Sequence, residues 1–345
     1  MGLPENTLLG VMRAVGEETR LRIVALLQHG ELTVSDLTDI LGQSQPRISR
    51  HLKLLAEAGV VDKHREGTFA FFELLGDGPI GELVADVMRH VDPHDQVLAT
   101  DLDRLAVVRS RRAAAAQEYF AAIAERWDEA RLLHAPDETV EAHVIEAIGD
   151  RPYDTLLDLG TGTGRMLQVL TQNATPTGHP VRRAIGLDNS HSMLAVARSN
   201  LERAEMRGVD LRQGDVYRPP FEPDSFELIV LHQVLHFLDD PARAVREAAR
   251  LLTPAGRLVI VDFAPHALEF LRTDHAHRRL GFRSDTVESW LDQCGLDVSH
   301  TATVDPPPSD RPANDTGQRL TVSMWVATDR RSVSTTTERD EQVAS

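Results

Sequence analysis

The segment TLLDLGTGTGR at residues 155–165 constrains the fold most, because an apolar run ends in an acid and is followed by glycines at every second position. A short apolar run bounded by turn residues is typical of a buried strand. Similar runs recur downstream, separated by helical segments such as 192–208 and 241–252. Strands that alternate with helices predict a parallel sheet covered on both faces. The expected strands span residues 155–160, 183–188, 209–215, 226–235, 257–263 and 319–329.

Length and composition limit the class of protein. At 345 residues with 41% apolar content, the chain is long enough for two hydrophobic cores. Its net charge of −16 excludes nucleic-acid binding through bulk charge, so any DNA contact needs a local basic patch. The single cysteine, Cys294, excludes a disulfide framework and a multi-cysteine metal site. Without an export signal or an apolar run long enough to span a membrane, we expect a cytoplasmic protein with no membrane partner.

The N-terminal third has the pattern of a winged helix-turn-helix. Apolar residues at helical spacing predict two helices within residues 7–29, and a third follows at 33–42. The next helix, 44–59, begins at a serine cap with proline in its first turn. Residues 60–74 alternate as two strands around a turn, which predicts the wing. Helices joined by a turn and followed by a hairpin indicate an α+β DNA-binding domain.

The second helix of such a motif enters the major groove, where arginine reads guanine and glutamine reads adenine. Between Gln43 and Arg65 there are five Lys or Arg residues against two acids, a local basic excess of three. This excess is the local basic patch that an acidic chain needs for DNA contact. The alternative is an ordinary three-helix domain with a solvated charged face. The predicted DNA-binding residues are Gln43, Ser44, Gln45, Arg47, Ser49, Arg50, His51, Lys53 and Arg65, with Thr68 beside Arg65 at the wing tip.

Residues 5–90 resemble the ArsR-type winged-helix transcriptional regulators, most clearly through ELTVSDLTDILGQSQPRISRHLKLLAEAGVV at 31–61. The resemblance implies a homodimer on pseudo-palindromic, double-stranded operator DNA. Metal sensors of that family often carry cysteines where this chain has Thr33 and Ser35, and hydroxyls do not replace thiolates for a soft metal. A zinc site on the last helix is disfavoured because Pro93 interrupts the spacing, so we predict no metal site. The residues for such a site would be His90, Asp92 and His94.

The glycine spacing distinguishes between two kinds of cofactor. A nicotinamide fingerprint requires a third glycine where this chain has Arg165. The spacing here suits a cofactor with an adenosine and a charged amino acid but no phosphate. Asp188, at the end of the next strand, could take both ribose hydroxyls, and Asp215 could accept from an adenine amine. The loop itself consists of Asp158, Gly160, Gly162 and Gly164.

Residues 118–330 resemble the class I S-adenosylmethionine-dependent methyltransferases, especially the branch related to quinone biosynthesis, through LLDLGTGTGR, AIGLDNSHSMLAVAR, GDVYRPPFEPDSFELIVLHQVLHFLDDP and LLTPAGRLVIVDF. The resemblance implies a Rossmann-like fold that binds S-adenosylmethionine or S-adenosylhomocysteine, with a lid helix over the pocket. For the lid residues and Met193, core packing is the alternative. The implied cofactor-binding residues are Tyr119, Trp127, Asp158, Gly160, Gly162, Gly164, Asp188, Asn189, Met193, Asp215, Val216, His232 and Gln233.

No sequence feature identifies a methyl acceptor. His232 and His236 flank the end of the fourth strand and are candidate bases, since histidine titrates near neutral pH. His266, His275 and His277 could also act as a base, bind an anionic acceptor or hold a domain interface. Arsenic methyltransferases require several cysteines. Because Cys294 is the single cysteine of this chain, we exclude that class of enzyme.

Three functions follow from the combination. The chain is a DNA-binding regulator with an S-adenosyl effector, a small-molecule methyltransferase with a DNA-binding head, or a regulator whose second domain serves only dimerisation. The complete DNA-reading helix favours the first, and the intact glycine loop disfavours the third. We expect a two-domain architecture with a winged-helix domain at 1–98, a helical linker and lid at 99–135, a methyltransferase-fold domain at 136–330 and a disordered tail at 331–345.

Overall fold

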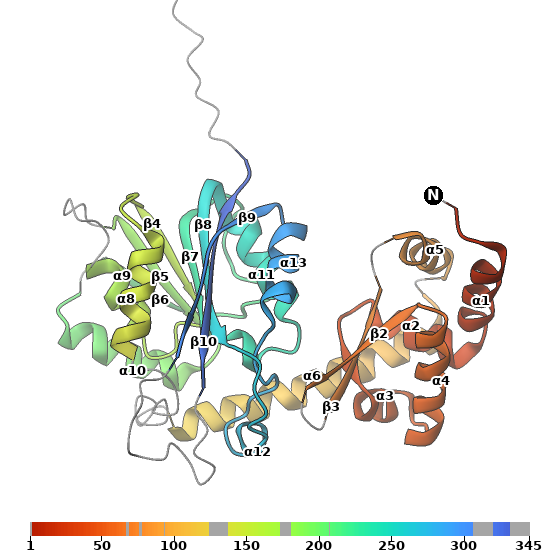
Figure 1. Cartoon of the computed structure of the whole chain (residues 1–345). Helices are drawn as coiled ribbons and strands as arrows, with labels where there is room; N and C mark the ends of the chain where they lie inside the picture. The colour runs from red at the N-terminus through yellow and green to blue at the C-terminus, as the bar shows by residue number, and fades with distance from the viewer. Residues whose placement is uncertain are drawn as a thin grey trace, which may run out of the picture. The chain divides into compact units, whose positions relative to one another are not determined.

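A computed structural model describes residues 2–66, 69–75, 78–92, 94–123, 137–172, 181–206, 208–305 and 320–331. The chain divides into two compact units (Figure 1). The first unit consists of Met1–Ala116 and Ala267–Arg278, and the second of Gln117–His266 and Arg279–Ser345. No helix among the described residues is both long and apolar enough to cross a membrane.

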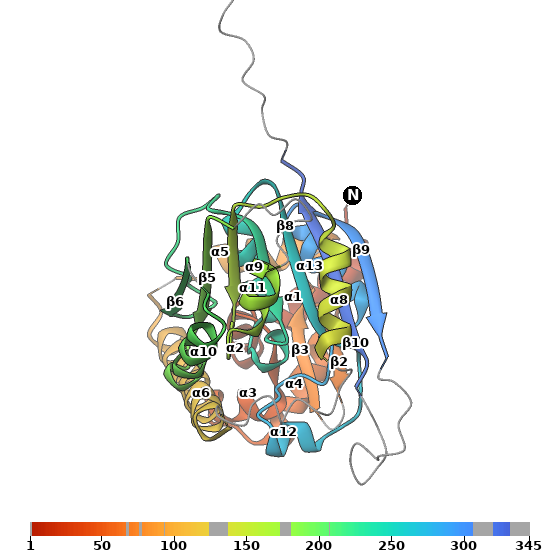
Figure 2. The same ribbon diagram turned by 90° about the vertical axis from the view of Figure 1, so that its left-hand side faces the viewer.

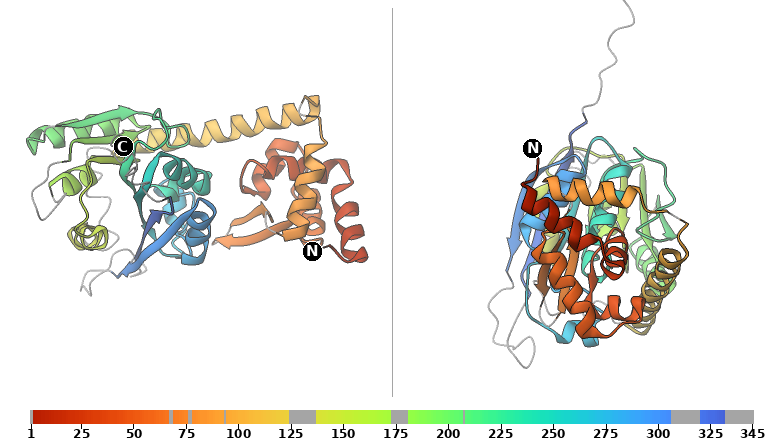
Figure 3. Two further views of the ribbon diagram at one scale, coloured as in Figure 1. Left: turned by 90° about the horizontal axis from the view of Figure 1, so that it is seen from above. Right: turned by 90° about the vertical axis from the view of Figure 1, so that its right-hand side faces the viewer.

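The first unit is a winged helix-turn-helix, as the sequence predicts. Its three-stranded antiparallel sheet has the order β1-β3-β2, and β2 and β3 form a wing that extends from the helices (Figure 3). The two-residue strand β1, which the sequence did not predict, pairs with β3. The elements are α1 (Glu5–Val15), α2 (Glu18–Leu27), β1 (Leu32–Thr33), α3 (Val34–Leu41), α4 (Gln45–Glu57), β2 (Val61–Glu66), β3 (Phe69–Leu74), α5 (Gly78–Arg89) and the start of α6 (Gln96–Ile123).

Capping and burial explain the helices of the helix-turn-helix motif. At the start of α3, the Thr33 side chain accepts from the Asp36 backbone, and Asp36 accepts from the Thr33 backbone. This reciprocal capping box satisfies two donors that the helix start would otherwise leave unpaired. Helix α4 buries Ile48, Leu52 and Leu55, one every three or four residues, so its other face remains exposed.

Within the helical linker, the Ala-, Arg- and Glu-rich sequence predicts one long helix at about residues 101–131, and the structure begins this helix earlier. Helix α6 begins at Gln96, and residues 124–131 of the prediction lie outside the described residues. Its first turns pack in the first unit, where Asp101 accepts two hydrogen bonds from Arg22, at 2.7 and 2.8 Å. Helix α12 (Phe270–Asp274) also belongs to this unit, where the Arg278 guanidinium lies 3.9 Å from the Asp36 carboxylate.

The second unit is built on a seven-stranded sheet of order β6-β5-β4-β7-β8-β10-β9, with β6 and β9 at its edges (Figure 2). The first five strands in this order, β6, β5, β4, β7 and β8, are parallel to one another, whereas β10 is antiparallel to β8 and β9. Helices α8, α9 and α10 lie on one face and α11 and α13 on the other (Figure 1). The strands are β4 (Thr155–Leu159), β5 (Arg183–Asp188), β6 (Val209–Gln213), β7 (Phe226–His232), β8 (Leu252–Phe263), β9 (Leu296–Val304) and β10 (Val322–Asp329). The helices are α8 (Asp137–Ile148), α9 (Arg165–Gln172), α10 (His191–Arg203), η3 (Leu235–Phe237), α11 (Pro241–Leu251) and α13 (Ser284–Gln293).

Several strands of this unit differ from the sequence prediction. Strand β6 ends at Gln213 rather than at residue 215, β8 begins at Leu252 rather than at 257, and β10 begins at Val322 rather than at 319. Strand β9 was not predicted, because it pairs only with β10 at the sheet edge and needs no apolar pattern for its backbone bonds. Strand β7 ends at His232 rather than at residue 235, because the chain turns there into the short helix η3.

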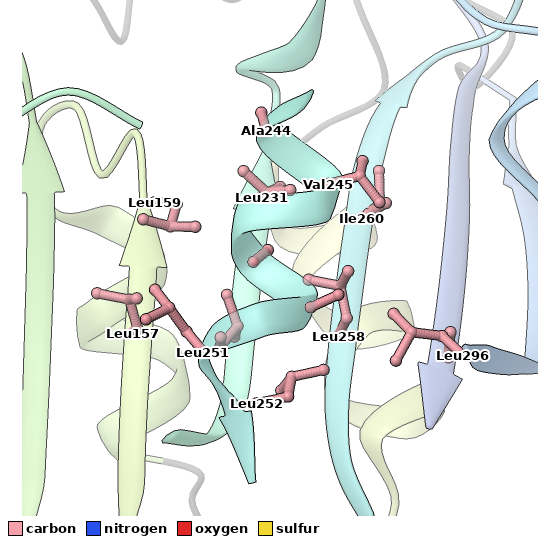
Figure 4. Close-up of a cluster of buried hydrophobic side chains, with 14 of the residues drawn as sticks. Leu157, Leu159, Leu231, Ala244, Val245, Leu251, Leu252, Leu258, Ile260 and Leu296 are labelled. Atoms are coloured by element: carbon pink, nitrogen blue, oxygen red, sulfur yellow. The ribbon is translucent and has the colours of Figure 1, made fainter. Parts of the chain in front are cut away.

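The hydrophobic core of the second unit includes the contact between α11 and the sheet (Figure 4). Leu157 and Leu159 of β4 and Leu231 of β7 are fully buried, as are the helix residues Ala244 and Val245. Because the central strands are parallel, the carboxyl ends of β4, β5, β7 and β8 lie at one edge of the sheet. Open sheets of this kind bind ligands at that edge.

Candidate functional site

The loop that joins β4 to α9 is tied to the end of β5 by its backbone. The Gly160 and Thr161 amides both donate to the Leu187 carbonyl, at 2.8 and 3.0 Å. Gly160, Gly162 and Gly164 have φ of +79°, +53° and +80°. These values lie in the left-handed region, which favours glycine because it has no Cβ.

The three glycines face different surroundings. A Cβ on Gly160 would lie 2.4 Å from Cγ2 of Val234, so the loop packs directly against the turn after β7. On Gly164 it would meet Ala197 of α10 at 3.2 Å. On Gly162 it would meet nothing within 4 Å. Gly160 and Gly164 therefore serve packing, whereas Gly162 leaves open space beside the loop.

Asp158, the acid of the glycine motif, is 1% exposed. Its Oδ2 accepts from the Thr161 hydroxyl at 2.7 Å, and within the described chain its buried Oδ1 has no hydrogen-bond partner. Burial raises the pKa of Asp158 to about 7, and repulsion by the Asp188 carboxylate acts in the same direction. A buried carboxylate with an unused acceptor atom is suited to a cationic group, which would satisfy that oxygen and favour the charged form.

Asp188, at the end of β5, holds the glycine loop. Its Oδ2 accepts from the Gly162 amide and its Oδ1 from the Ser190 amide, each at 2.8 Å. Burial raises the pKa of Asp188, against the lowering effect of these bonds. The sequence prediction considered Asp188 only as a ribose ligand, and missed this bond to the loop because it depends on how β4 and β5 pair.

The predicted adenine-side residues differ in exposure. Met193, in the first turn of α10, is 2% exposed, and Val216 is also buried. Asp215 is exposed, and its Oδ1 accepts from the Tyr217 amide at 2.9 Å. Asn189 is exposed and its carbonyl accepts from Gln213. Asp188, Asn189 and Asp215 follow neighbouring strands, as the spacing predicts.

Helix α6 supplies one of the two predicted lid residues. Tyr119 is half-buried, and burial raises its pKa to about 12. Its neighbour Phe120 packs edge to face on Phe237 of η3, with 4.8 Å between the ring centroids. The other predicted lid residue, Trp127, lies outside the described residues.

The end of β7 and the turn after it carry three of the predicted residues. His232 is half-buried, whereas Gln233 and His236 are buried. Gln233 has φ of +52°, its backbone amide donates to the Val261 carbonyl at 2.7 Å, and among the described atoms its buried Nε2 has no partner. The His236 Nδ1 lies 2.8 Å from Oδ1 of Asp262, a fully buried residue at the end of β8 that the sequence prediction did not consider.

The other candidate histidines are divided between the two units. His266 belongs to the second unit and donates its amide to the Leu280 carbonyl. His275 and His277 belong to the first unit, within Ala267–Arg278. Among the described residues, His90, Asp92 and His94 included, no three metal-ligating side chains come together.

The exposed face of α4 contains most of the predicted DNA-binding side chains. Gln43 and His51 are exceptions, because they are partly buried against the preceding helices. Gln43 Nε2 donates to the Thr19 hydroxyl at 3.3 Å, and His51 Nδ1 lies 3.4 Å from the Glu17 carboxylate. The side chain of Arg65 and all of Thr68 lie outside the described residues. The exposed residues are Ser44, Gln45, Arg47, Ser49, Arg50 and Lys53.

Two family models match this chain. Residues 17–63 match the bacterial regulatory proteins of the ArsR family, and residues 157–260 match a methyltransferase domain. The first range contains α4, and the second contains the glycine loop with Asp158 and Asp188.

Individual relatives align with parts of the chain. A protein of Streptomyces fradiae transposon Tn4556 is 37% identical over 117 residues, which cover 34% of this chain and 32% of that protein. A Lactococcus lactis demethylmenaquinone methyltransferase is 29% identical over 148 residues, which cover 42% and 57%. A Halobacterium salinarum arsenite methyltransferase is 30% identical over 111 residues, which cover 32% and 27%. The chain thus spans less than two thirds of each relative's length.

A solved structure supports the fold. The complex of the Haloferax volcanii Trm112 methyltransferase activator with a putative methyltransferase matches at a TM-score of 0.51 and 21% identity, covering 61% of this chain and 96% of that one. The chain therefore joins a winged helix-turn-helix region that matches the ArsR family of bacterial regulatory proteins to a methyltransferase domain, and its fold resembles that of the solved complex.

Proposed function

We propose that this protein is a DNA-binding transcriptional regulator whose methyltransferase-fold domain binds S-adenosylmethionine or S-adenosylhomocysteine as its effector. The proposal rests on one observation: the same chain has a helix suited to reading DNA and a loop suited to binding an S-adenosyl ligand. Helix α4 exposes Arg47 and Arg50, and the glycine loop lies over a buried Asp158 whose Oδ1 has no partner among the described atoms.

The second unit supports an S-adenosyl ligand through the chemistry of its side chains. Asp158 suits the ammonium group of the ligand's amino acid, and the open space at Gly162 leaves room beside the loop. Asp188 has carboxylate lone pairs for the ribose hydroxyls in addition to its bonds to the loop. The remaining proposed ligand residues are Tyr119, Trp127, Gly160, Gly164, Asn189, Met193, Asp215, Val216, His232 and Gln233.

The first unit supports operator binding by a homodimer. An α4 helix whose polar face is exposed can enter the major groove, and a two-fold dimer would place two such helices on successive half-sites. Helix α1 exposes Leu8, Leu9 and Met12, between 39% and 48%, which is unusual for three large apolar residues on one short helix. This apolar surface is our candidate for the dimer contact.

The proposal is tested by measuring operator affinity with fluorescent upstream DNA while titrating S-adenosylmethionine and S-adenosylhomocysteine separately. An effector shifts DNA binding only if it binds the free and DNA-bound forms with different affinity. We expect at least one ligand to change the dissociation constant for DNA. Operator binding that is indifferent to both ligands would contradict the effector role.

Two variants separate the sites. Arg50→Ala should weaken operator binding without changing ligand affinity, and Asp188→Ala should lower ligand affinity by about 1.5 to 3 kcal/mol, the value of a charged hydrogen bond. Arg89→Ala, which removes an exposed arginine of α5, is the control for nonspecific charge loss. Equal loss of both activities in Arg50→Ala would indicate damage to the fold.

The alternative function is a methyltransferase with a DNA-binding head, which the 29% identity to a demethylmenaquinone methyltransferase favours. The bound cofactor would supply an electrophilic methyl group, and His232 at the end of β7 would remove the acceptor's proton. Formation of S-adenosylhomocysteine with reduced demethylmenaquinone as acceptor would support this function. Arsenite is a poor candidate substrate, since the chain has one cysteine and the metal chemistry requires several thiolates.

A further inference from the structure

Asp262 is a fully buried carboxylate near the carboxyl end of strand β8, and the proposed function does not use it. Its Oδ1 lies 2.8 Å from the His236 ring Nδ1, and its Oδ2 accepts from the His236 backbone amide at 3.3 Å. It also accepts from the Phe263 amide at 2.8 Å. Since an ionised carboxylate can only accept, the His236 proton on this side is carried by Nδ1.

Because His236 belongs to η3, these hydrogen bonds connect η3 to the end of β8. The His236 ring packs against Phe237 and Phe263, with centroids 4.0 and 4.9 Å away, and the His236 carbonyl accepts from the Arg279 amide at 3.0 Å. A buried pair of this kind is costly to break, because removing one partner leaves the other without its bond in a place that water does not reach.

The turn held in this way is the one that touches the ligand loop. Val234 packs so closely on Gly160 that a Cβ there would be 2.4 Å away. Gln233, the preceding residue, has the strained φ of +52° and is fixed by its bond to Val261. Non-glycine residues in this region cost roughly 1 to 3 kcal/mol and persist only where the surroundings impose them.

We propose that Asp262 is a positioning residue that acts through His236 Nδ1 to hold the 233–236 turn against the glycine loop, and so sets the affinity of the loop for the S-adenosyl ligand. Asp262 does not touch the ligand in this proposal. The inference rests on the proposed function, because it assumes that the loop binds this ligand.

The test exploits the stereochemistry of amide replacements at position 236. An asparagine side chain places its amide nitrogen where histidine has Nδ1, whereas glutamine places it nearer Nε2. If Nδ1 is the atom that matters, His236→Asn should retain the bond to Asp262, and His236→Gln and His236→Ala should lose it. We would measure S-adenosylhomocysteine binding by titration calorimetry and the melting temperature of each variant.

We expect His236→Ala, His236→Gln and Asp262→Ala to weaken S-adenosylhomocysteine binding by about tenfold or more, and His236→Asn to stay within about threefold of the unsubstituted protein. Tyr153→Phe is the matched control, because it removes a buried hydrogen bond to the Leu170 carbonyl at the other end of β4. It should lower the melting temperature without changing the affinity.

The outcomes distinguish this inference from the function on which it rests. If the unsubstituted protein does not bind S-adenosylhomocysteine or S-adenosylmethionine, the proposed function fails. If it binds and His236→Gln binds as tightly as His236→Asn, the role of Nδ1 is overturned while the function stands. Should Asp262→Ala not fold, Asp262→Asn and the three substitutions at position 236 still decide the question.

Discussion

At the scale of single residues, we expect Asp158 to make the proposed ligand binding depend on pH. Its pKa is about 7 because it is buried, so much of it is protonated in the unliganded protein at neutral pH. A cationic ligand favours the ionised form, and binding below pH 7 must therefore release a proton. We expect affinity for S-adenosylmethionine to fall by up to about tenfold per pH unit below about 7 and to level off above it.

Titration calorimetry in two buffers of different ionisation enthalpy measures both the affinity and the released proton. Asp158→Asn should remove the pH dependence along with most of the affinity. Affinity that does not change between pH 6 and pH 8 would rule out proton release by Asp158.

The same carboxyl group affects folding in the opposite sense. Because its pKa is higher in the folded than in the unfolded protein, its contribution to the free energy of unfolding is lost as the pH rises from about 4 to about 7.

The glycines of the loop provide a matched pair of substitutions. Gly160→Ala and Gly162→Ala both place a Cβ at positive φ, but only the first also collides with Val234. We expect Gly160→Ala to lower the melting temperature much more, and Gly162→Ala to fold but to bind the S-adenosyl ligand weakly because its Cβ enters the open space. Scanning calorimetry and ligand titration check the two effects. Equal melting temperatures would contradict the close approach of Val234.

At the scale of elements, the capping box at the start of α3 stabilises the DNA-binding motif. Thr33→Ala removes the acceptor for the Asp36 amide and should lower the free energy of unfolding by about 1 kcal/mol, as for other helix caps. Thr38→Ala is the control, since its hydroxyl only donates to the carbonyl one turn back, at Val34. Urea denaturation of both variants makes the comparison. A larger loss for Thr38→Ala would mean that the cap contributes little.

Elements differ in how far the sequence could predict them. Strand β4 and the wing strands β2 and β3 were predicted because their apolar pattern reflects burial within their own segments. Strand β9 was missed, since an edge strand is selected by its partner and not by its own hydrophobicity. Asp262 was missed for a related reason: the signal for its role is His236, which lies on another element 26 residues away.

At the scale of the whole molecule, the apolar surface of α1 predicts association. Replacing Met12, which is 48% exposed, by glutamate would bury a charge in the proposed dimer contact. We expect Met12→Glu to shift the protein to the monomer mass in light scattering and to weaken operator binding, because one half-site is lost. Arg13→Ala, next to it on the same helix, should change neither property. A dimer that persists in Met12→Glu would move the contact elsewhere.

The sequence by itself determined the two fold classes, the order of their elements and the residues of the glycine loop, because hydrophobic period, caps and glycine spacing are local properties of a chain. Only the tertiary structure decided which of these residues act together. Strand pairing brings Asp188 to the Gly162 amide, packing presses Val234 on Gly160, and segment Ala267–Arg278 joins the DNA-binding unit although it follows β8. Such contacts depend on distances in space, which the spacing of residues along the chain does not encode.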